Sequence, residues 1–511
     1  MLPILTPTES AALDRASGER GISIASLMES AGWAVAQAAA DLVGGAYGRR
    51  AVVVCGKGNN GGDGLAAARH LDRWGMGVTA VLMAPPGSIR DSAGVNFRRY
   101  AEAGGRWRRF SHDSLSRELA RADVVIDAIF GTGFRGGPEG AFARAIELIN
   151  GSGAEVVAVD IPSGVEGETG AVRGEAVRAD LTVTLGSLKP GVVFHPGAAH
   201  AGEVEIADIG FTADLVHSEL WLVEPNDVAN LIKPRAAESH KRASGVVLVV
   251  AGSRAMTGAA ALTAISAYRA GGGLVTLAVP ESILPVVQGL VKETTFLPLP
   301  ETDGGSASAE AWPVLAERLE EVDAAAVGPG LSTDPSTVEL VRRLVAESPV
   351  PFVLDADGLN AFTGQGVGLA DRRSDAVITP HPGEFGRLTG LSSKEVLEDR
   401  VGHARKAAAE FRCAVLLKGS RTVIVRPDGT AFVNPTGGPF LATGGTGDVL
   451  TGAIGAFLAR GMQPADAAVL GAYAHGMAGQ WAAAERGEGT VASDVATELP
   501  RALASLSRLI P

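Results

Sequence analysis

Short apolar runs alternate with Ala-rich segments along the whole chain. In the first part, continuous apolar runs bounded by Gly and Pro predict strands at 51–56, 77–83, 122–130, 155–162 and 181–186. Ala-rich segments at 22–43 and 63–74 are typical of helices that cover a sheet. Because the runs are continuously apolar rather than alternating, they suit strands buried on both faces of a parallel sheet. The pattern therefore predicts βαβ units.

The apolar signal weakens after Ile206, and the segment 224–245 is polar and interrupted by Pro. A fresh apolar strand at 245–253 then restarts the alternation. Further strands are predicted at 274–280, 324–330, 351–357, 375–380, 414–419 and 422–427. We therefore expect two α/β domains, residues 1–215 and 225–511, with the boundary within 212–225.

Composition and charge narrow the function classes. The 511 residues carry a formal net charge of −12, which disfavours nucleic acid as a partner. The two cysteines, Cys55 and Cys413, lie in apolar runs and are expected to be buried thiols, with no disulfide framework or cysteine-based metal site. The first residues lack the order of a signal peptide, and no run of about 20 apolar residues could span a bilayer. We expect a cytoplasmic protein without a membrane partner.

A glycine-rich loop follows the first predicted strand, at 56–64. Gly56, Gly58 and Gly61 match G-x-G-x-x-G, but the second strand ends in LMAPP, without the acid that a dinucleotide fold places there. No Lys-Ser/Thr pair follows, so a Walker loop is excluded as well. Asn59, Asn60 and Asp63 add oxygen ligands that phosphate binding alone does not require. A capped tight turn is the alternative interpretation.

Two further strands end in polar side chains. Asp127 closes one strand, and Asp160 with Ser163 closes the next. A single Asp at a strand end is usually a helix cap. The carboxyl ends of neighbouring parallel strands open on one crevice, however, so three Gly-rich loops of this kind favour a binding site.

The motifs GKGNNGGDG, DAIFGTGFRG, VDIPSG and TLGSLKPG together resemble the NAD(P)H-hydrate epimerase domain, which is Rossmann-like. This resemblance implies a potassium ion bound by Asn60, Asp127 and Ser163, and oxygen ligands with one carboxylate suit such a cation. It implies that the hydrated nucleotide is bound by Asn59, Asn60, Gly61, Gly62, Asp63, Gly131, Thr132, Gly133, Phe134, Arg135, Gly136, Gly137 and Asp160. We expect Asp160 to act as acid/base in the epimerisation.

The sharpest motif in the second part is GGTGDVLTGAIGAF. Gly444, Gly445 and Gly447 open an apolar helix with Asp448 in its first turn. Backbone N–H groups at such a helix start can hold a transferring phosphoryl group, and the Asp can accept a hydroxyl proton. The alternative is that Asp448 only complements the helix dipole in a Gly-rich bend.

Other segments of the second part agree with phosphoryl transfer. Lys418 ends a strand, and the following residues turn back in a way that could grip phosphates. His381 precedes a predicted helix with Glu384 in its first turn, although a single loop histidine is usually a surface residue. The GPGL segment at 328–331 allows close backbone approach, and VLDADGLN (353–360) ends a strand with two carboxylates.

These motifs resemble the ribokinase-like superfamily and, within it, the ADP-dependent NAD(P)H-hydrate dehydratases, over nearly all of residues 240–500. The resemblance implies that Ala259, Gly330, His381 and Asp448 contact the hydrate, with Asp448 as the catalytic base. It implies that the adenine nucleotide is bound by Lys418, Gly419, Ser420, Arg421, Thr422 and Gly447. Magnesium is expected to neutralise the transferring charge. Both domains are thus expected to be three-layer α/β/α folds.

The two resemblances together imply nicotinamide nucleotide repair. One domain would interconvert the R and S forms of hydrated NADH and NADPH, and the other would dehydrate the S form with ADP, giving AMP and phosphate. The expected partners are these small molecules and further copies of the chain in a homo-oligomer. The alternative is a small-molecule kinase, acting on hydroxyethylthiazole-like or sugar-like alcohols, with a non-catalytic N-terminal binding or dimerisation domain.

Overall fold

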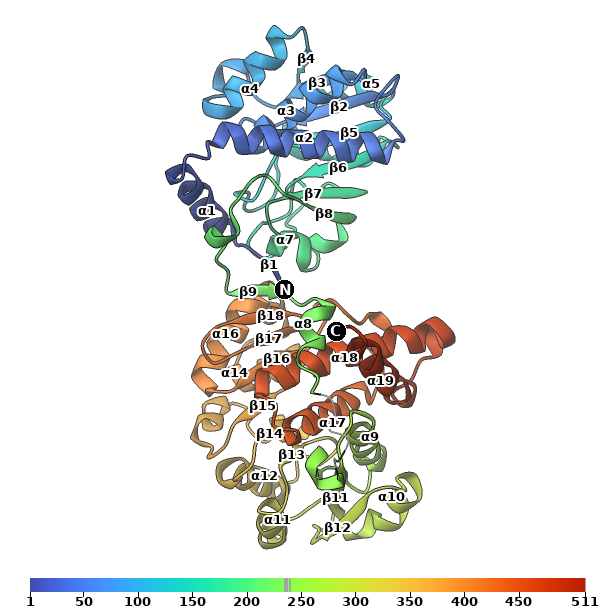
Figure 1. Ribbon diagram of the computed structural model, residues 1–511. Helices are drawn as coiled ribbons and strands as arrows, with labels where there is room; N and C mark the ends of the chain where they lie inside the picture. Colours follow the sequence, from blue (N-terminus) through green and yellow to red (C-terminus); the bar gives the residue numbers. More distant parts are fainter. Residues whose placement is uncertain (234–237, 239, 511) are drawn as a thin grey trace. The chain divides into compact units, whose positions relative to one another are not determined.

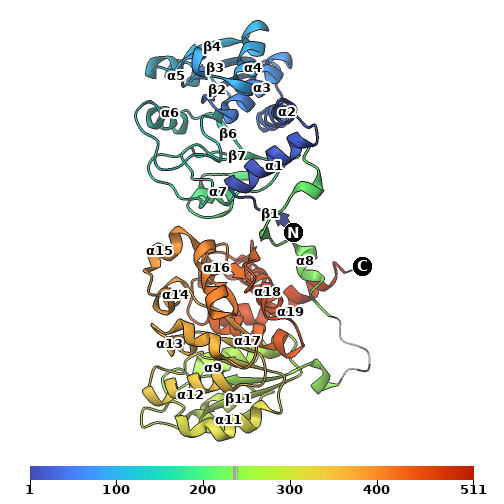
Figure 2. The ribbon, with the colours of Figure 1, turned by 90° about the vertical axis from the view of Figure 1, so that its left-hand side faces the viewer.

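The computed structural model describes residues 1–233, 238 and 240–510. The chain divides into two compact units, Leu2–Ser218 and Glu219–Pro511. Figures 1 and 2 show that each unit consists of a sheet with helices packed on its faces. Among the described residues, none of the helices combines the length and apolar character that crossing a bilayer requires.

The sheet of the N-terminal unit is parallel throughout. Its strand order is β4-β3-β2-β5-β6-β7-β8. The bounds are β2 (Arg50–Cys55), β3 (Gly77–Leu82), β4 (Arg106–Arg109), β5 (Val124–Ala128), β6 (Glu155–Val159), β7 (Leu181–Leu185) and β8 (Glu203–Ala207). A short strand, β1 (Leu2–Pro3), precedes the first helix.

Helices cover both faces of this sheet. The helices of this unit are α1 (Pro7–Glu19), α2 (Ile24–Leu42), α3 (Asn59–Arg73), α4 (Asp91–Glu102), α5 (His112–Leu119), α6 (Ala141–Asn150) and α7 (Pro190–Val193). Val53 of β2 packs toward α2, α3 and α4, whereas Val52 and Val54 pack toward α5 and α6. Because side chains alternate across a strand, this continuously apolar strand contributes to the cores on both faces.

The N-terminal unit differs from the predicted elements in two places. The helix predicted to begin at 63 begins at Asn59, so the Asn-Asn-Gly-Gly-Asp segment forms its first turns rather than a free loop. A Cβ at Gly61 would lie 2.1 Å from the Gly56 carbonyl oxygen, which explains why glycine is needed in this helix. The edge strands β4 and β8 were not predicted because they are largely exposed and lack an apolar run.

The C-terminal sheet is mainly parallel, in the order β9-β18-β17-β16-β15-β14-β13-β10-β11-β12. The exception is β17, which pairs antiparallel with both of its neighbours. The bounds are β9 (Leu220–Leu222), β10 (Val246–Val250), β11 (Leu274–Pro280), β12 (Thr295–Leu299), β13 (Ala324–Val327), β14 (Phe352–Leu354), β15 (Ala376–Ile378), β16 (Ala414–Leu417), β17 (Val423–Val425) and β18 (Ala431–Val433).

Helices also cover both faces of the C-terminal sheet (Figure 1). One face carries α9 (Thr257–Arg269), α17 (Thr446–Ala459), α18 (Pro464–Arg486) and α19 (Ala492–Ser507). The remaining helices are α8 (Pro225–Ala229), α10 (Leu284–Leu290), α11 (Trp312–Leu319), α12 (Pro335–Glu347), α13 (Asp357–Asn360), α14 (Pro382–Thr389), α15 (Ser393–Glu398) and α16 (Arg400–Phe411).

Helix α17 is apolar on all sides and lies in the core of this unit. Gly452 allows α9 to approach, since a Cβ there would lie 2.1 Å from the Thr263 carbonyl oxygen, and Gly455 faces Ala326 of β13. The buried helix therefore holds its own N-terminus, and Asp448 in its first turn, in a fixed place above the sheet. The predicted fold class, two α/β domains with parallel sheets and helices on both faces, is confirmed.

Candidate functional site

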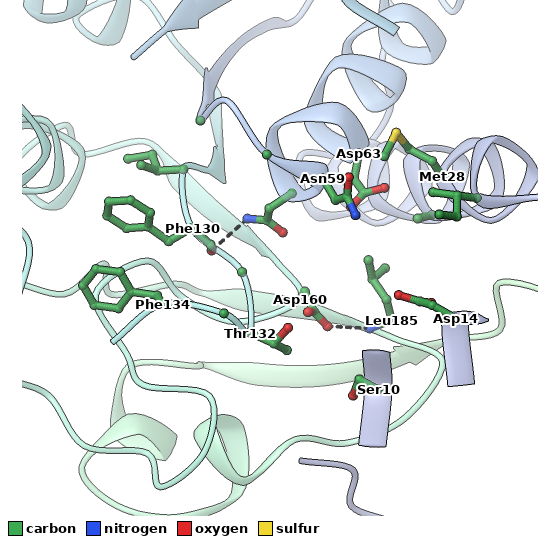
Figure 3. Close-up of a pocket in the computed structure, with 18 of the residues that line it drawn as sticks. Ser10, Asp14, Met28, Asn59, Asp63, Phe130, Thr132, Phe134, Asp160 and Leu185 are labelled. Atoms are coloured by element: carbon green, nitrogen blue, oxygen red, sulfur yellow. Dashed lines mark hydrogen bonds between the residues drawn. The ribbon is translucent and has the colours of Figure 1, made fainter. Parts of the chain in front are cut away.

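A cavity of about 850 Å³ lies in the N-terminal unit, at the loops that follow β2, β5 and β6 (Figure 3). Parallel strands open on a common crevice at these ends, as the sequence predicted. The predicted substrate-binding residues that line the cavity are Asn59, Asn60, Asp63, Gly131, Thr132, Gly133, Phe134, Arg135 and Asp160. The other predicted residues, Gly61, Gly62, Asp127, Gly136, Gly137 and Ser163, are not among its lining residues.

The glycines outside the lining support the walls of the cavity. A Cβ at Gly62 would lie 2.7 Å from the Met28 sulfur, and one at Gly137 would lie 2.0 Å from the Arg173 carbonyl oxygen. The Gly136 N–H donates to a carboxylate oxygen of Glu166 at 2.9 Å. These positions hold the loops in place through the backbone.

Asp160 is held at the edge of the cavity in a constrained conformation. Its φ is +67°, in the left-handed region that a non-glycine residue seldom occupies. The Lys189 ammonium donates to Asp160 Oδ1 at 2.5 Å, and the Leu185 N–H donates to the same oxygen at 3.1 Å. Strain of this kind concentrates at functional sites. Lys189 was not predicted as a site residue, although it lies in the TLGSLKPG motif.

Two more carboxyl groups line the cavity, from helices at different points of the chain. Asp63 lies in the second turn of α3, and Asp14 lies on α1. Burial, reinforced by the charges of Asp160 and Asp14, raises the pKa of Asp63 well above its usual range. Burial also raises the pKa of Asp14, against the opposing effect of Lys189. Asp14 was not predicted, because it belongs to none of the Gly-rich loops.

The three residues expected at the potassium site gather around the backbone of Phe130. The Ser163 hydroxyl donates to Asp127 Oδ1 at 2.6 Å, and its N–H donates to Oδ2 at 2.7 Å. Asn60 Nδ2 donates to the Phe130 carbonyl oxygen at 2.8 Å, and the Phe130 N–H donates to the Ser163 hydroxyl at 2.9 Å. Carboxylate, hydroxyl, amide and carbonyl oxygens thus lie close together, and this donor set fits a monovalent hard cation.

Burial raises the pKa of Asp127 to about 6, against the hydrogen bonds from Ser163 and Ile129. A buried carboxylate surrounded by neutral donors gains from a nearby positive charge. Within the described ranges, no group of three or more histidine, cysteine, aspartate or glutamate side chains comes together to hold a metal ion.

In the C-terminal unit, the start of α17 is open rather than walled off. Gly445 is the N-cap, with a φ of +90°, and a Cβ there would lie 2.8 Å from a Leu262 methyl group. Gly444 is exposed, and Gly447 and Asp448 are half-buried. The N–H groups of a helix's first turn have no partner within the helix, and at this partly exposed, glycine-rich start they can bind an anion.

Asp448 stands in a cluster of charged groups. The Lys418 ammonium donates to Asp355 Oδ1 at 2.6 Å, and the Thr451 hydroxyl donates to Asp355 Oδ2 at 2.7 Å. A Cβ at Gly447 would lie 3.2 Å from the Lys418 nitrogen, so the ammonium lies directly beside the helix start. Asp355 was not predicted as a site residue, although it is one of two carboxylates that we noted at the end of that strand.

The charged cluster at the start of α17 shifts the pKa of both Asp448 and Lys418. Burial and the neighbouring Asp355 carboxylate raise the pKa of Asp448 to about 7, and Lys418 opposes this only in part. Burial lowers the pKa of Lys418, but Asp355 and Glu384 outweigh that effect and leave it raised. A carboxylate that titrates near neutrality is suited to accept a proton in catalysis.

The residues expected to contact the hydrate come from separate elements. Gly330 has a φ of +66°, and a Cβ there would lie 3.0 Å from that of Ala259, so these two positions adjoin. His381 caps α14, its Nδ1 accepting from the Gly383 N–H at 3.0 Å, and its side chain is 51% exposed. Its Nε2 lies 3.5 Å from Glu384 Oε1. The histidine therefore has a structural role already and presents its ring to solvent.

The predicted nucleotide-binding loop after β16 is held by hydrogen bonds from within the loop and from α16. Gly419 and Ser420 are exposed, and the Thr422 hydroxyl donates to the Gly419 carbonyl oxygen at 3.0 Å. Arg400 of α16 donates to carbonyl oxygens of this loop, at Leu417, Ser420 and Arg421. Sequence reasoning missed Arg400, since no local motif marks an arginine that acts on a distant backbone.

Comparison with known proteins assigns both halves. Residues 24–191 match the family model described as YjeF-related protein N-terminus, and residues 247–501 match the one described as NAD(P)H-hydrate dehydratase. A bifunctional NAD(P)H-hydrate repair enzyme of Moorella thermoacetica is 44% identical, over 98% of this chain and 97% of its own length. The chain belongs to this family of repair enzymes.

A second family member, from Thermofilum pendens, is 42% identical over 97% of this chain and 95% of its own length. A solved ribokinase-like superfamily protein from Enterococcus faecalis V583 matches with a TM-score of 0.50 at 23% identity, covering 57% of this chain and 98% of its own. That likeness shows the fold alone. Full-length relatives that are repair enzymes do not support the alternative of a small-molecule kinase with a non-catalytic N-terminal domain.

Proposed function

We propose that this chain interconverts the R and S forms of hydrated NADH and NADPH and dehydrates the S form with ADP, giving the reduced nucleotide, AMP and phosphate. The observation that carries the dehydratase part is the Asp448 carboxyl, which has a pKa of about 7 at an open, glycine-rich helix start beside the Lys418 ammonium. A proton acceptor, anion-binding N–H groups and a cation lie together at this helix start. Phosphoryl transfer to an alcohol requires these three groups.

In the dehydration, Asp448 takes the proton from the hydroxyl of the hydrate as that oxygen attacks the terminal phosphorus of ADP. The bond from this phosphorus to the bridging oxygen breaks, and AMP leaves. The N–H groups at the start of α17 and the Lys418 ammonium stabilise the negative charge of the transferring phosphoryl group. The hydroxyl, a poor leaving group, becomes a phosphate ester. The ring nitrogen then expels phosphate, and loss of a proton from the adjacent carbon completes the double bond.

Magnesium would supply further positive charge to the phosphates. In such sites the ion is bound mostly by phosphate oxygens and water, with one or two carboxylates. Asp357 and Glu384 are charged neighbours of Asp448, and their carboxylates are the ones we propose to approach it. We also propose that the hydrate is contacted by Ala259, Gly330 and His381. We propose that the nucleotide is bound by Lys418 to Thr422 and by Gly447.

The epimerase part is supported by the N-terminal cavity. Its lining includes the backbone of Gly-rich loops, which can bind phosphates, and the Asp160–Lys189 pair, which can transfer protons. We propose that Asn60, Asp127 and Ser163 bind a potassium ion next to it, at the backbone of Phe130. A cytoplasmic location and a homo-oligomeric state remain proposals from the sequence.

Asp448→Asn tests the dehydratase site. The variant keeps the shape of the side chain and removes the base, so the return of reduced-nicotinamide absorbance with ADP should be abolished, while epimerisation without ADP continues. The exposed Asp371 provides a matched control as Asp371→Asn. Retained dehydration by Asp448→Asn would refute the assignment of the base.

Asp160→Asn tests the epimerase site in the same chain. We expect epimerisation to fall about 10²–10⁴-fold, because general acid–base catalysis contributes that much, while ADP-dependent dehydration of the S form is retained. The rate is measured by separating the two epimers over time, after subtraction of the spontaneous exchange. An unchanged rate would remove Asp160 from the mechanism.

A further inference from the structure

The N-terminal cavity carries two kinds of carboxyl group on two of its sides. Figure 3 shows Asp63 entering from α3, whereas Asp160 lies at the end of the strand below it and Asp14 approaches from α1. Asp160 is bound by the Lys189 ammonium and by the Leu185 N–H. Lys189 therefore hydrogen-bonds Asp160, whereas Asp63 and Asp14 feel its charge without a hydrogen bond from it.

Asp63 is the unusual member of this set. Asp63 is only 7% exposed. Within the part of the chain that the structure describes, its carboxyl accepts no hydrogen bond. Asp63 is one of the residues that line the cavity. A buried carboxyl without a partner is costly when ionised, and it is best satisfied by holding a proton that a ligand can accept.

We propose that Asp63 is a catalytic acid of the epimerisation and that Asp160 acts from the other side of the ring as its base. This inference rests on the proposed epimerase function and gives it a mechanism, in which water leaves one face of the ring and returns to the other. Asp14 is a positioning residue, since its charge beside Asp63 favours the protonated form.

Asp63 donates its proton to the hydroxyl, the bond between carbon and oxygen breaks, and water departs. The lone pair of the ring nitrogen forms a double bond to the same carbon, which becomes electrophilic. A water molecule adds from the opposite face and gives its proton to Asp160. The proton lost by Asp63 equals the one gained by Asp160, and the other epimer reacts with the two roles exchanged.

The surrounding charges agree with this division of roles. The charged groups that bear on Asp63 are Asp160, Asp14 and Lys189. The two carboxylates raise its pKa and the ammonium opposes them, while burial has the largest effect. The Lys189 nitrogen hydrogen-bonds Asp160 directly, so the ammonium lies against the proposed base and not against the proposed acid.

The test compares epimerisation by Asp63→Asn, Asp63→Glu and Asp14→Asn with that of the unaltered full-length chain, in water enriched in ¹⁸O and without ADP. Asp72→Asn, an exposed position on the same helix, is the matched control. We expect Asp63→Asn to lose about 10²–10⁴-fold of the rate, and Asp63→Glu to recover part of it. Each inversion by the unaltered protein should introduce one oxygen atom from the solvent.

Asp14→Asn tests the role of Asp63 through the pH profile of epimerisation, which would not shift if Asp63 had only a structural role. Removing its charge lowers the pKa of Asp63, so the decline of the rate at high pH should begin at a lower pH than in the unaltered protein. If Asp63→Asn proves unfolded by circular dichroism, this shift still decides the question. An unshifted profile, inversion with retention of the original oxygen, or a folded Asp63→Asn with full activity would overturn the proposal. Absence of epimerisation in the unaltered protein would instead overturn the proposed function.

Discussion

The Lys418 ammonium and the Asp355 carboxylate, 63 residues apart in the chain, are joined by a hydrogen bond of 2.6 Å at the start of α17. Asp355 is 1% exposed, and Thr451 of α17 donates to its other oxygen. The pair therefore ties the end of β16, the end of β14 and the first turns of α17 together. It fixes the cation that we propose for the phosphoryl group.

Asp355→Asn should lower the rate of dehydration by about 10- to 100-fold, because Lys418 loses the carboxylate that holds it. Since the charge of Asp355 also raises the pKa of Asp448, its removal should move the midpoint of the pH profile below about 7. Steady-state kinetics at several pH values measure both effects. Asp375→Asn, an exposed position, is the control. A lower rate with an unmoved midpoint would mean that Asp355 acts only on the fold.

The unaltered protein should show a dehydration rate that rises with pH and reaches half of its maximum near pH 7. Asp448 acts as a base only when ionised, and its pKa is raised to about 7 by burial and by Asp355. Below that pH the carboxyl is protonated and cannot accept the hydroxyl proton. The profile is measured with saturating ADP and hydrate. A rate that is flat from pH 5.5 to 8.5 would contradict this role.

Potassium should stabilise the N-terminal unit as well as activate it. Binding to the folded state alone raises the midpoint of thermal unfolding in proportion to the logarithm of the cation concentration. We expect this rise with potassium in the unaltered protein and its loss in Asp127→Asn and Ser163→Ala, measured by calorimetry at constant ionic strength with choline as the balancing cation.

The control for the potassium experiment is Asp113→Asn, whose side chain is 87% exposed and should leave the response intact. Because the pKa of Asp127 is about 6, the response should also weaken below that pH, as protons compete with the cation. Equal stabilisation of Asp127→Asn and the unaltered protein would place the cation elsewhere.

Gly330→Ala should destabilise the C-terminal unit and impair dehydration. The position has a φ of +66°, and the new Cβ would lie 2.8 Å from that of Met256. A strained backbone of this kind costs about 1–3 kcal/mol, so thermal unfolding should begin several degrees lower. Gly258→Ala, in the same neighbourhood but with nothing within 4 Å of the new Cβ, should be neutral or slightly stabilising. Equal behaviour of the two variants would contradict the steric argument.

Most of the central elements could be predicted from local pattern. The strands β2, β5, β10 and β13 are short, apolar and bounded by Gly or Asp, and helix α17 follows its glycines as expected. The edge strand β4 could not be predicted, since Arg-Trp-Arg-Arg has no apolar run and is exposed at every position. Such strands owe their conformation to pairing with a neighbour rather than to burial.

The candidate site residues also divide into those that local sequence pattern could identify and those that only the fold reveals. Asp160 and Asp448 could be found because each follows or precedes a Gly-rich segment at the end of a regular element. Lys189, Asp355 and Arg400 were not assigned, because each becomes significant only through a partner that the fold brings close. Asp14 is a further case, since nothing in its own helix marks it as a cavity residue.

The sequence by itself determined two α/β domains, their glycine loops and the repair-enzyme family to which they belong, because hydrophobic period and loop composition are local properties. Only the tertiary structure decided which carboxyl groups are paired and which stand alone. Asp160 pairs with Lys189 across 29 residues, and Asp355 pairs with Lys418 across 63. Asp63 lines the cavity and has no such partner among the residues that the structure describes. Charge interactions depend on distance through space and on burial, and the order of residues along a chain specifies neither.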